Sequence, residues 1–364
     1  MRIQIDARKL NEGGIGRYIR EVVGPWLVDR RVERVRCFGH PAELQAWLAD
    51  RDPRGIVDVV PWVDPDYSFR AQVNWPRLHQ GPHSWPADVS LFPHYDIPLL
   101  AHPAPSIVVV HDLIHLEVAD AFPAWKRAGA AAMLRAVCQR ATEVITVSRA
   151  SGRAIRAFMG DSGPRVHVVP NGVSEVFVPP PEPLSSAVPA PVAPYVLVVA
   201  PHKPHKNLAF AVRVLGHLPE REGWRLLLVG PRGAEVAAIA RAAGQPGLEA
   251  RIEAVGAVDD RELRDLYRGA RAVLVPSRLE GFGLPALEAC ACGTRALAPD
   301  LPWARELEMF GVERLRHWEP GAWARAIRAR PAGALPASSP RADVPRWREA
   351  SDATFDLLRA VTHS

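Results

Sequence analysis

The sequence predicts an α/β protein built from two doubly wound, parallel-sheet domains in tandem. Short apolar runs alternate with helical patterns along both halves of the chain, which is typical of parallel β–α–β units. Two of these runs, YVLVVA at 195–200 and RLLLVG at 225–230, are nearly all apolar, as strands covered on both faces require. The length of 364 residues also exceeds that of one ordinary domain. We therefore expect two Rossmann-like domains.

A proline-rich segment divides the chain near its middle. Residues 178–194 read VPPPEPLSSAVPAPVAP, a composition that resists helix formation and cannot supply ladder hydrogen bonds at its prolines. We interpret it as a linker between an N-terminal domain, residues 1–177, and a C-terminal domain, residues 195–345. A second proline-rich stretch, 330–345, precedes a helical pattern at 346–364. Because this stretch is a flexible tether, we expect the last helix to cross back to the N-terminal domain.

The alternation of patterns places the elements of each domain. In the N-terminal domain it predicts strands at 2–6, 57–61, 89–92, 107–111, 144–147 and 166–169, and helices at 17–27, 125–141 and 150–158. In the C-terminal domain it predicts strands at 195–200, 225–229, 252–255, 272–275 and 295–298, and helices at 208–218, 234–243, 262–267 and 285–290. Ligands of doubly wound sheets bind beyond the carboxyl ends of the strands. We therefore expect the chemistry in a crevice where the two domains face each other.

Composition excludes several classes of protein. Hydrophobic residues at 48% and charged residues at 23% exclude a disordered or collagen-like chain. The 45 Lys and Arg residues are scattered and exceed Asp and Glu by only five, which favours anionic small molecules or an anionic membrane surface over nucleic acid. Four irregularly spaced cysteines do not suit a disulfide framework or a zinc site. Since no run of about 18 uncharged apolar residues predicts a membrane span, we expect a cytoplasmic protein.

Two loops in the N-terminal half carry candidate site residues. The turn around Gly13, Gly14, Gly16 and Arg17 opens a helix, where backbone amides and the helix dipole attract a phosphate. The alternative is a flexible turn that only begins the helix. His111 ends an apolar strand, and the carboxylate that follows it could orient its ring for binding or catalysis. A structural histidine satisfied by the backbone is the alternative there.

Two loops in the C-terminal half complete the candidate set. Lys206 belongs to a loop that contains two histidines and two lysines and precedes a helix. Basic side chains at a helix N-terminus are suited to bind an anion. The alternative is a basic loop that is only solvated. The loop 276–288 contains Glu280, and Pro285 suits the first turn of a helix. Glu288, one turn into that helix, could accept from the diol of a ribose, or it is a surface carboxylate. The backbone amides expected to converge on a phosphate are those of Phe282, Gly283 and Leu284.

The same loop permits a dinucleotide-binding interpretation. Gly281, Gly283 and Ala286 fit the pattern G-x-G-x-x-A, and Asp300 stands near the position of a ribose-binding carboxylate. The first glycine lies too far from its strand, however, and the remaining chain is too short for a second mononucleotide half. Asp64-Pro65-Asp66 has the spacing of a metal-binding pair, but its Pro- and Trp-rich context indicates a turn.

In the order of these motifs the chain resembles the retaining glycosyltransferases of family 4, which have the GT-B fold. The segments that carry the resemblance cover nearly the whole chain, and the two glutamates separated by seven residues, in the wording EGFGLPALEA, are the most specific of them. They are GGIGRY (13–18), VHDLIHL (110–116), VITVSRAS (144–151), VVPNGVSEVF (168–177), PHKPHKNL (201–208), LLLVGPRG (226–233) and DLYRGARAVLVPSRLEGFGLPALEACACGT (265–294).

The resemblance implies a role for each candidate residue. Gly14 and Gly16 would face the diphosphate of a nucleotide-sugar donor, and His111 would hydrogen-bond the transferred sugar. Lys206 would neutralise the departing nucleoside diphosphate, and Glu280 would contact hydroxyls of the sugar. The roles of the remaining residues are phosphate binding by the amides of Phe282, Gly283 and Leu284, and ribose binding by Glu288.

The resemblance also implies a donor and an acceptor. Neither a metal ion nor another cofactor is expected if Lys206 and the loop amides suffice to stabilise the leaving diphosphate. The sequence motif PHKN resembles the corresponding motif of bacterial mannosyltransferases of surface-polysaccharide assembly. A GDP-mannose-like donor is therefore the first expectation, and a UDP-sugar is the second. The acceptor would be a hydroxyl of a glycan, a glycolipid or a lipid-linked glycan. An NAD-type dehydrogenase and a non-catalytic sugar- or nucleotide-binding protein are the alternative functions.

Some positions depart from the family pattern. Ala200 stands where many relatives have an arginine, and His205 stands where an arginine commonly precedes the lysine, so Lys206 would carry more of the phosphate charge. Arg17, Lys203 and His202 are candidate helpers. The stretch 300–306 differs as well.

Tryptophans suggest a peripheral contact with anionic membranes. Aromatic rings beside cations suit a headgroup interface, although tryptophans that fill the core of the N-terminal domain are the alternative. The residues concerned are Trp26, Trp47, Trp62, Trp75, Trp85 and the triplet Trp125-Lys126-Arg127.

Overall fold

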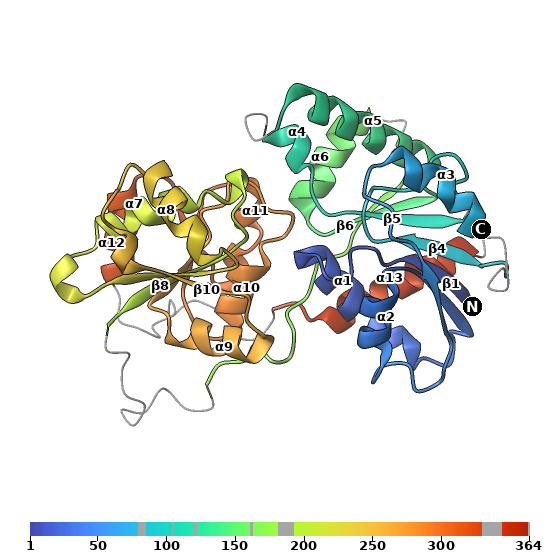
Figure 1. Ribbon diagram of the computed structural model, residues 1–364, viewed down its shortest axis with the longest axis horizontal. Helices are drawn as coiled ribbons and strands as arrows, with labels where there is room; N and C mark the ends of the chain where they lie inside the picture. The colour runs from blue at the N-terminus through green and yellow to red at the C-terminus, as the bar shows by residue number, and fades with distance from the viewer. Residues whose placement is uncertain are drawn as a thin grey trace. The chain divides into compact units, whose positions relative to one another are not determined.

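The computed structural model describes residues 1–78, 85–103, 105–118, 122–160, 163–180, 193–329 and 344–362. The chain forms two compact units, shown in Figure 1: unit 1 comprises Met1–Gly172 and Arg346–Ser364, and unit 2 comprises Val173–Pro345. The boundary thus precedes the expected end of the first domain at residue 177. Most of the expected linker, residues 181–192, lies outside the described residues.

Unit 1 contains a seven-stranded sheet in the order β3-β2-β1-β4-β5-β6-β7. Every neighbouring pair in it is parallel. The strand order reverses between β1 and β4, which are adjacent in the sheet, and such a switch point is where doubly wound sheets place ligands. The strands are β1 (Arg2–Asp6), β2 (Arg34–Gly39), β3 (Val57–Pro61), β4 (Val89–Phe92), β5 (Ser106–Val110), β6 (Glu143–Thr146) and β7 (Val166–Val168).

The sequence analysis missed strand β2 because two arginines interrupt its apolar pattern. Arg36 is nevertheless buried, 1% exposed. Its guanidinium lies 4.2 Å from the centre of the Trp85 ring and donates a hydrogen bond to the Trp85 carbonyl at 3.1 Å. A planar cation stacked on an aromatic ring in this way can be accommodated within a sheet.

Helices cover the sheet of unit 1, and the last helix of the chain is one of them. The helices are α1 (Gly13–Val23), α2 (Pro41–Leu48), α3 (Phe69–Leu78), α4 (Ile114–Glu117), α5 (Ala124–Arg140), α6 (Arg149–Met159) and α13 (Trp347–Thr362), with a 3₁₀ turn, η1 (Gly24–Leu27). The Ser351 hydroxyl donates to the Val22 carbonyl at 2.8 Å, and the rings of Trp26 and Phe355 lie 5.7 Å apart. Thus α13, drawn in red in Figure 1, packs against α1 although most of the chain separates them.

Unit 2 contains a six-stranded parallel sheet in the order β10-β9-β8-β11-β12-β13. Its strands are β8 (Tyr195–Val199), β9 (Arg225–Val229), β10 (Ile252–Gly256), β11 (Ala272–Leu274), β12 (Ala296–Pro299) and β13 (Glu313–Leu315). Its helices are α7 (Leu208–Gly216), α8 (Gly233–Ala242), α9 (Asp260–Gly269), α10 (Leu284–Ala291), α11 (Pro302–Arg305) and α12 (Pro320–Arg328), and its 3₁₀ turns are η4 (Pro204–Lys206), η5 (Glu220–Glu222), η6 (Glu249–Arg251) and η7 (Glu308–Phe310). The predicted fold class, two doubly wound parallel sheets, is confirmed.

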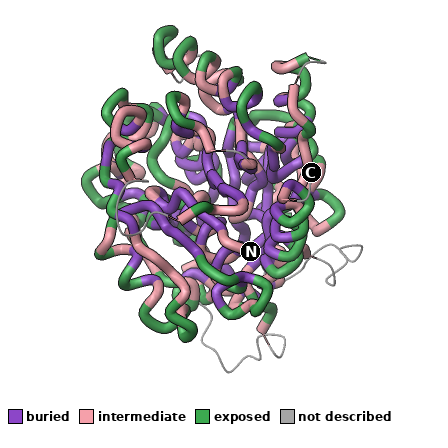
Figure 2. Tube along the Cα trace, turned by 90° about the vertical axis from the view of Figure 1, so that its right-hand side faces the viewer, coloured by how far each residue is buried: buried purple, intermediate pink, exposed green. Residues whose placement is uncertain are grey.

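The tryptophans of unit 1 lie mainly in its core, which corrects the basis of the membrane expectation. Trp26, Trp47, Trp62 and Trp75 are at most 6% exposed. Three rings pack on one another, Trp62 and Trp75 with centres 4.8 Å apart and Phe38 within 4.8 Å of Trp75. Burying rings of this size contributes strongly to a core. Figure 2 shows the interior position of the buried stretches, in purple.

Trp125, at the start of α5, is different because it is 72% exposed. The Lys126 ammonium lies 5.3 Å from the centre of its ring. Among the described residues, no helix is long and apolar enough to cross a membrane.

Burial of His102 predicts that acid destabilises unit 1. Its Nε2 lies 2.6 Å from the Ser106 hydroxyl, and burial lowers the pKa of the ring to about 4. In the unfolded chain the ring titrates near its ordinary pKa of about 6.5, so the unfolded state binds the proton more readily. The stabilisation from neutral His102 is therefore present above about pH 6.5 and is lost as the pH falls towards 4.

Melting temperatures of the wild type and His102→Gln between pH 7.5 and 4.5 check this expectation. We expect a smaller loss on acidification in the variant, while the exposed-site control His40→Gln follows the wild type. Equal slopes for all three proteins would contradict it.

Candidate active site

Two loops of unit 2 meet at one edge of the sheet. Strands β8 and β11 are adjacent and parallel, with Val196 opposite Ala272. The loops that follow them, 200–207 and 275–283, therefore leave the same edge, at the point where the strand order reverses. The Arg278 amide donates to the His205 carbonyl at 2.8 Å and ties the loops together. Sheet topology thus brings together residues that lie far apart in the sequence.

Lys206 and Glu280, both predicted from the sequence, form an ion pair at this edge. The Lys206 ammonium donates to Glu280 Oε1 at 2.8 Å and to Oε2 at 2.7 Å. Their side chains are 16% and 10% exposed, so the pair is largely shielded from water. Lys206 ends η4, and Asn207, in a left-handed conformation with a φ of 53°, connects it to α7. An ammonium has three donors, so Lys206 can hold a second anionic group without releasing Glu280.

The N-terminus of α10 follows directly after this loop. Gly283 precedes the helix with a φ of 90°, a conformation that glycine adopts readily and other residues rarely do. A Cβ atom at this position would lie 2.9 Å from Leu307 and 3.0 Å from Trp303. Phe282 is buried, 7% exposed, and Leu284 begins the helix. Gly283 therefore fixes the turn that carries the three amides expected to bind phosphate.

Glu288 lies one turn further along α10 and is more deeply buried than the sequence suggested. It is 4% exposed, and the Tyr267 hydroxyl donates to its Oε2 at 2.8 Å. The alternative of a surface carboxylate is therefore wrong. The sequence analysis missed Tyr267. The available signal was its spacing of four residues from Leu263, which places both side chains on the same, buried face of α9.

His111 directly follows β5 in unit 1, but a backbone group rather than Asp112 orients its ring. Its Nε2 donates to the Pro93 carbonyl at 2.8 Å, and the Tyr18 ring packs edge-on at 5.2 Å. Asp112 instead accepts from the Ile114 amide at 3.0 Å. Burial lowers the pKa of His111, although the Pro93 carbonyl opposes this effect. A neutral ring with its proton on Nε2 presents Nδ1 as an acceptor.

The glycines in the first turn of α1 have separate explanations. A Cβ on Gly16 would lie 2.2 Å from the Leu10 carbonyl oxygen, so packing of α1 against the preceding loop requires glycine there. A Cβ on Gly14 would meet no atom within 4 Å, and this glycine is exposed. Arg17 is half-buried on the same turn. Since Tyr18 of α1 contacts His111, the glycine turn and His111 belong to neighbouring parts of unit 1.

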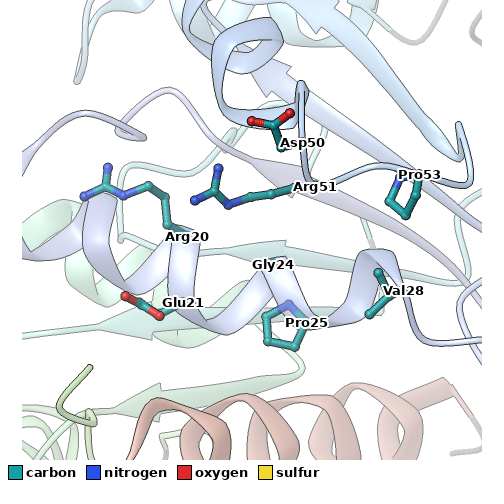
Figure 3. Close-up of a pocket in the computed structure, with 8 residues that line it drawn as sticks. All are labelled: Arg20, Glu21, Gly24, Pro25, Val28, Asp50, Arg51 and Pro53. Atoms are coloured by element: carbon teal, nitrogen blue, oxygen red, sulfur yellow. The ribbon is translucent and has the colours of Figure 1, made fainter. Parts of the chain in front are cut away.

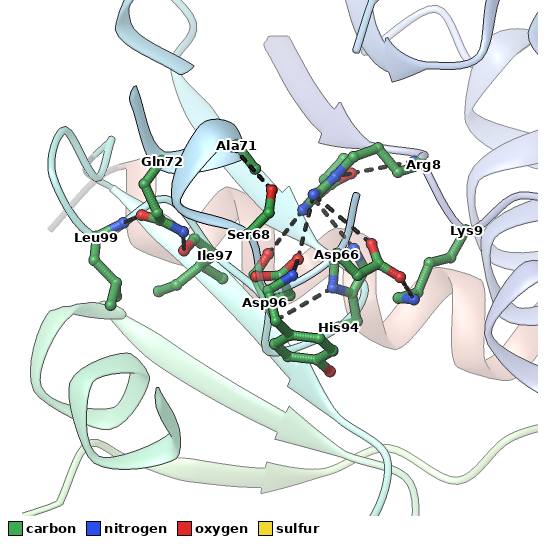
Figure 4. A network of polar contacts seen from close by, with 12 residues as sticks. Arg8, Lys9, Asp66, Ser68, Ala71, Gln72, His94, Asp96, Ile97 and Leu99 are labelled. Carbon is green, nitrogen blue, oxygen red and sulfur yellow. Dashed lines mark hydrogen bonds and ion pairs between the residues drawn. The ribbon is translucent and has the colours of Figure 1, made fainter. Parts of the chain in front are cut away.

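A charged network that the sequence analysis missed follows β1 and β4 (Figure 4). Arg8 donates to Asp6 at 2.8 Å and lies 3.2 Å from Asp96, while His94 Nε2 lies 3.1 Å from Asp6. Burial opposes ionisation of Asp6, but Arg8 and His94 outweigh it and hold its pKa below the ordinary range. Lys9 extends the network. The alternation of Gln4, Asp6 and Arg8 along and just after β1 was the available signal.

The Asp64-Pro65-Asp66 segment supplies partners to cations of the protein. Asp64 accepts from Arg70 at 2.7 Å, and Asp66 pairs with Lys9. Among the described residues, no group of three or more candidate ligands could hold a metal ion.

Unit 1 also has a surface pocket of about 330 Å³, drawn in Figure 3. It is lined by Arg20, Glu21, Gly24, Pro25, Val28, Asp50, Arg51 and Pro53, which include none of the predicted site residues.

The dinucleotide-binding alternative does not agree with the surroundings of Asp300. Strand β11 ends at Leu274, well before Gly281. Asp300 accepts from Arg305 at 2.9 Å and also pairs with Arg314. Its carboxylate thus forms ion pairs with two arginines of unit 2.

Comparison with known proteins agrees with this arrangement of loops. The family model described as Glycosyltransferase Family 4 matches residues 12–177, and that described as Glycosyl transferases group 1 matches residues 188–316. The chain belongs to glycosyltransferase family 4. The predicted resemblance is therefore confirmed, and the two matches together cover loops from both units that carry the predicted site residues.

Curated relatives of this family 4 chain include enzymes named for different acceptors. It is 34% identical over 222 residues to the D-inositol 3-phosphate glycosyltransferase of Xylanimonas cellulosilytica, covering 54% of this chain and 52% of the relative. It is 25% identical over 236 residues to the O-antigen chain mannosyltransferase RfbU of Salmonella typhimurium, covering 65% and 62%. The chain thus matches about half to two thirds of the length of these relatives.

Solved structures establish the GT-B fold of this family 4 chain. HepE of Anabaena in complex with UDP and glucose has a TM-score of 0.74 at 19% identity, with 99% of this chain and all of that chain covered. WaaG, a glycosyltransferase involved in lipopolysaccharide biosynthesis, has a TM-score of 0.69 at 14% identity, with 100% and 98% covered.

Gly283→Ala tests whether the turn before α10 depends on glycine. The positive φ and the contacts with Leu307 and Trp303 predict a loss of about 1–3 kcal/mol in the free energy of unfolding. Chemical denaturation measures it, with Gly233→Ala as the control, because a Cβ on Gly233 would meet no atom within 4 Å. Equal stability of the two variants would contradict the requirement.

Proposed function

We propose that the protein is a retaining glycosyltransferase that moves a hexose from a nucleoside-diphosphate sugar to a hydroxyl group of an acceptor. The observation that carries this proposal is the Lys206–Glu280 ion pair beside the N-terminus of α10, with Glu288 one turn further on. A cation, a helix N-terminus and a buried carboxylate at one sheet edge match the phosphates and the ribose of a donor.

Charge development explains the roles of these groups. When the bond between the anomeric carbon and the phosphate oxygen breaks, negative charge develops on the diphosphate and positive charge on the sugar. Lys206 and the amides of Phe282, Gly283 and Leu284 would stabilise the diphosphate without reorganising. Glu280 would accept from sugar hydroxyls while it holds Lys206 in place. Glu288 would accept from the ribose diol.

The groups of unit 1 would act on the transferred sugar and the phosphates. Neutral His111 would accept a hydrogen bond from a hydroxyl of the sugar at Nδ1, because its Nε2 proton is engaged by the Pro93 carbonyl. Gly14, with open space around it, would let a phosphate approach the start of α1, and Arg17 lies on the same turn. Gly16 would contribute by holding α1 close to its preceding loop.

The donor and acceptor are proposed from the relatives and the sequence. A GDP-mannose-like donor is the first choice, supported by the relative named as an O-antigen chain mannosyltransferase, and a UDP-sugar is the second. The acceptor would be a glycan, a glycolipid or a lipid-linked glycan. We propose that transfer needs no metal ion and takes place in the cytoplasm.

The proposed function is tested with a panel of GDP-, UDP- and dTDP-sugars. A donor that binds the folded protein raises its melting temperature by mass action. Incubation with that donor and a panel of glycan and glycolipid acceptors in EDTA should transfer the sugar to an acceptor hydroxyl with retained anomeric configuration and release the nucleoside diphosphate. Binding without release would favour a non-catalytic sugar- or nucleotide-binding protein. Reduction of NAD instead would favour the dehydrogenase.

Lys206→Ala should lower kcat by about 100-fold or more, because the ammonium acts on charge that develops in the transition state. The melting temperature should fall much less than this loss of activity suggests. Steady-state kinetics check the expectation, with Arg221→Ala, which removes an exposed basic side chain of unit 2 that is not a site candidate, as the control. A Lys206 variant with wild-type kcat and KM would remove this residue from the mechanism.

We propose that any membrane contact involves Trp125 and Lys126 rather than the buried tryptophans. An exposed ring with an adjacent cation suits an anionic headgroup layer, and each basic residue contributes about 1 kcal/mol there. Co-sedimentation with vesicles of phosphatidylserine and phosphatidylcholine checks it: Trp125→Ala should reduce binding at low salt. Absence of binding by the wild type at low salt would contradict the contact.

A further inference from the structure

A buried tyrosine on α9 reaches the carboxylate assigned to the ribose. Tyr267 is 0% exposed, and its hydroxyl donates to Glu288 Oε2 at 2.8 Å. We propose that Tyr267 is a positioning residue, which orients Glu288 so that its carboxylate meets the ribose diol of the donor nucleotide. The proposal rests on the proposed function, since it assigns Tyr267 a task at the same site.

Tyr267 is held through both its ring and its backbone. The Phe177 ring packs edge-on against it with centres 5.8 Å apart. The Thr294 hydroxyl, from the segment that follows α10, donates to the Tyr267 carbonyl at 2.7 Å. Helix α9 itself begins with a capping box between Asp259 and Glu262. The hydroxyl therefore approaches Glu288 from a fixed direction.

A fixed donor matters because Glu288 is buried and its terminal torsion is soft. The last torsion of a glutamate has a broad energy profile, so burial alone does not set the plane of the carboxylate. A buried carboxylate also needs hydrogen-bond donors to remain favourable. The phenol supplies one donor and fixes one oxygen, which sets where the rest of the group points. Binding groups that are held in place before the ligand arrives lose less entropy on binding.

Tyr267 could instead serve only the stability of α9 and α10, and the two roles differ in what they predict for ligands. A purely structural bond would affect all nucleotides alike. A positioning role through Glu288 should affect ligands in proportion to their ribose hydroxyls.

The experiment compares Tyr267→Phe with a matched control, Tyr195→Phe. The Tyr195 hydroxyl donates to the Leu266 carbonyl at 2.8 Å, so the control also removes a phenol bond to α9 but leaves Glu288 untouched. Calorimetry measures the affinities of GDP and UDP, and of the 2′,3′-dideoxy form of whichever binds more tightly. Melting temperatures establish that both variants are folded.

We expect Tyr267→Phe to weaken the ribonucleotide by about tenfold, which corresponds to about 1.4 kcal/mol. The dideoxynucleotide should change less than about twofold, and Tyr195→Phe should leave both ligands nearly unchanged. In a double-mutant cycle, adding Tyr267→Phe to Glu288→Gln should cause little further loss, because both changes remove one coupled interaction. Phe177→Leu, which removes the ring that packs edge-on against Tyr267 and leaves Glu288 unchanged, should show a weaker loss of the same ribose-specific kind and serves if Tyr267→Phe is unstable.

Three outcomes would overturn the proposal, and they separate it from the proposed function. Equal losses for both ligands, or for both tyrosine variants, would leave Tyr267 a structural role only. A normal Tyr267→Phe beside a weakened Glu288→Gln would reject positioning and keep the ribose role of Glu288. Wild-type affinity in Glu288→Gln would reject both roles, while turnover of a nucleotide sugar would still support the transferase.

Discussion

The ion pair between Lys206 and Glu280 depends on one constraint, the parallel pairing of β8 with β11. Parallel strands end at the same edge of a sheet, so the loops after these two strands meet although 74 residues separate the partners. The bond between the Arg278 amide and the His205 carbonyl then locks the loops. With both of its oxygens accepting from one ammonium, Glu280 holds Lys206 in place at this edge of the sheet. The remaining features of the site, the turn at Gly283 and the buried carboxylate on α10, follow directly from the loop after β11.

In unit 1, adjacent parallel strands also bring two loops together, and paired charges connect these loops. Its strand order reverses between β1 and β4, and a network of buried charges follows these two strands. Buried charges destabilise a fold unless they are paired, and here Arg8 serves Asp6 while also lying near Asp96. The network keeps the loops after β1 and β4 together. His111 follows the next strand, β5, and the Pro93 carbonyl at the end of β4 fixes its ring.

The sequence predicted most of the fold because buried parallel strands have a strong apolar signal. It failed where a polar residue is buried beside a specific partner. Strand β2 was missed because Arg36 is accommodated by the Trp85 ring, which lies far along the chain. Asp112 was expected to orient His111, since the two are adjacent, yet its carboxylate bonds to a backbone amide two residues on.

The sequence by itself indicated the candidate residues: the glycine turn, His111, Lys206 and the loop and helix with Glu280 and Glu288 all lie in segments that follow strands predicted from the apolar runs. The tertiary structure decided what each of them contacts. It paired Lys206 with Glu280, placed Tyr267 on Glu288 and brought α13 back onto α1. The physical reason is that local pattern fixes strands and helices, whereas contacts between distant residues depend on the order of strands in the sheet and on which side chains share a buried space.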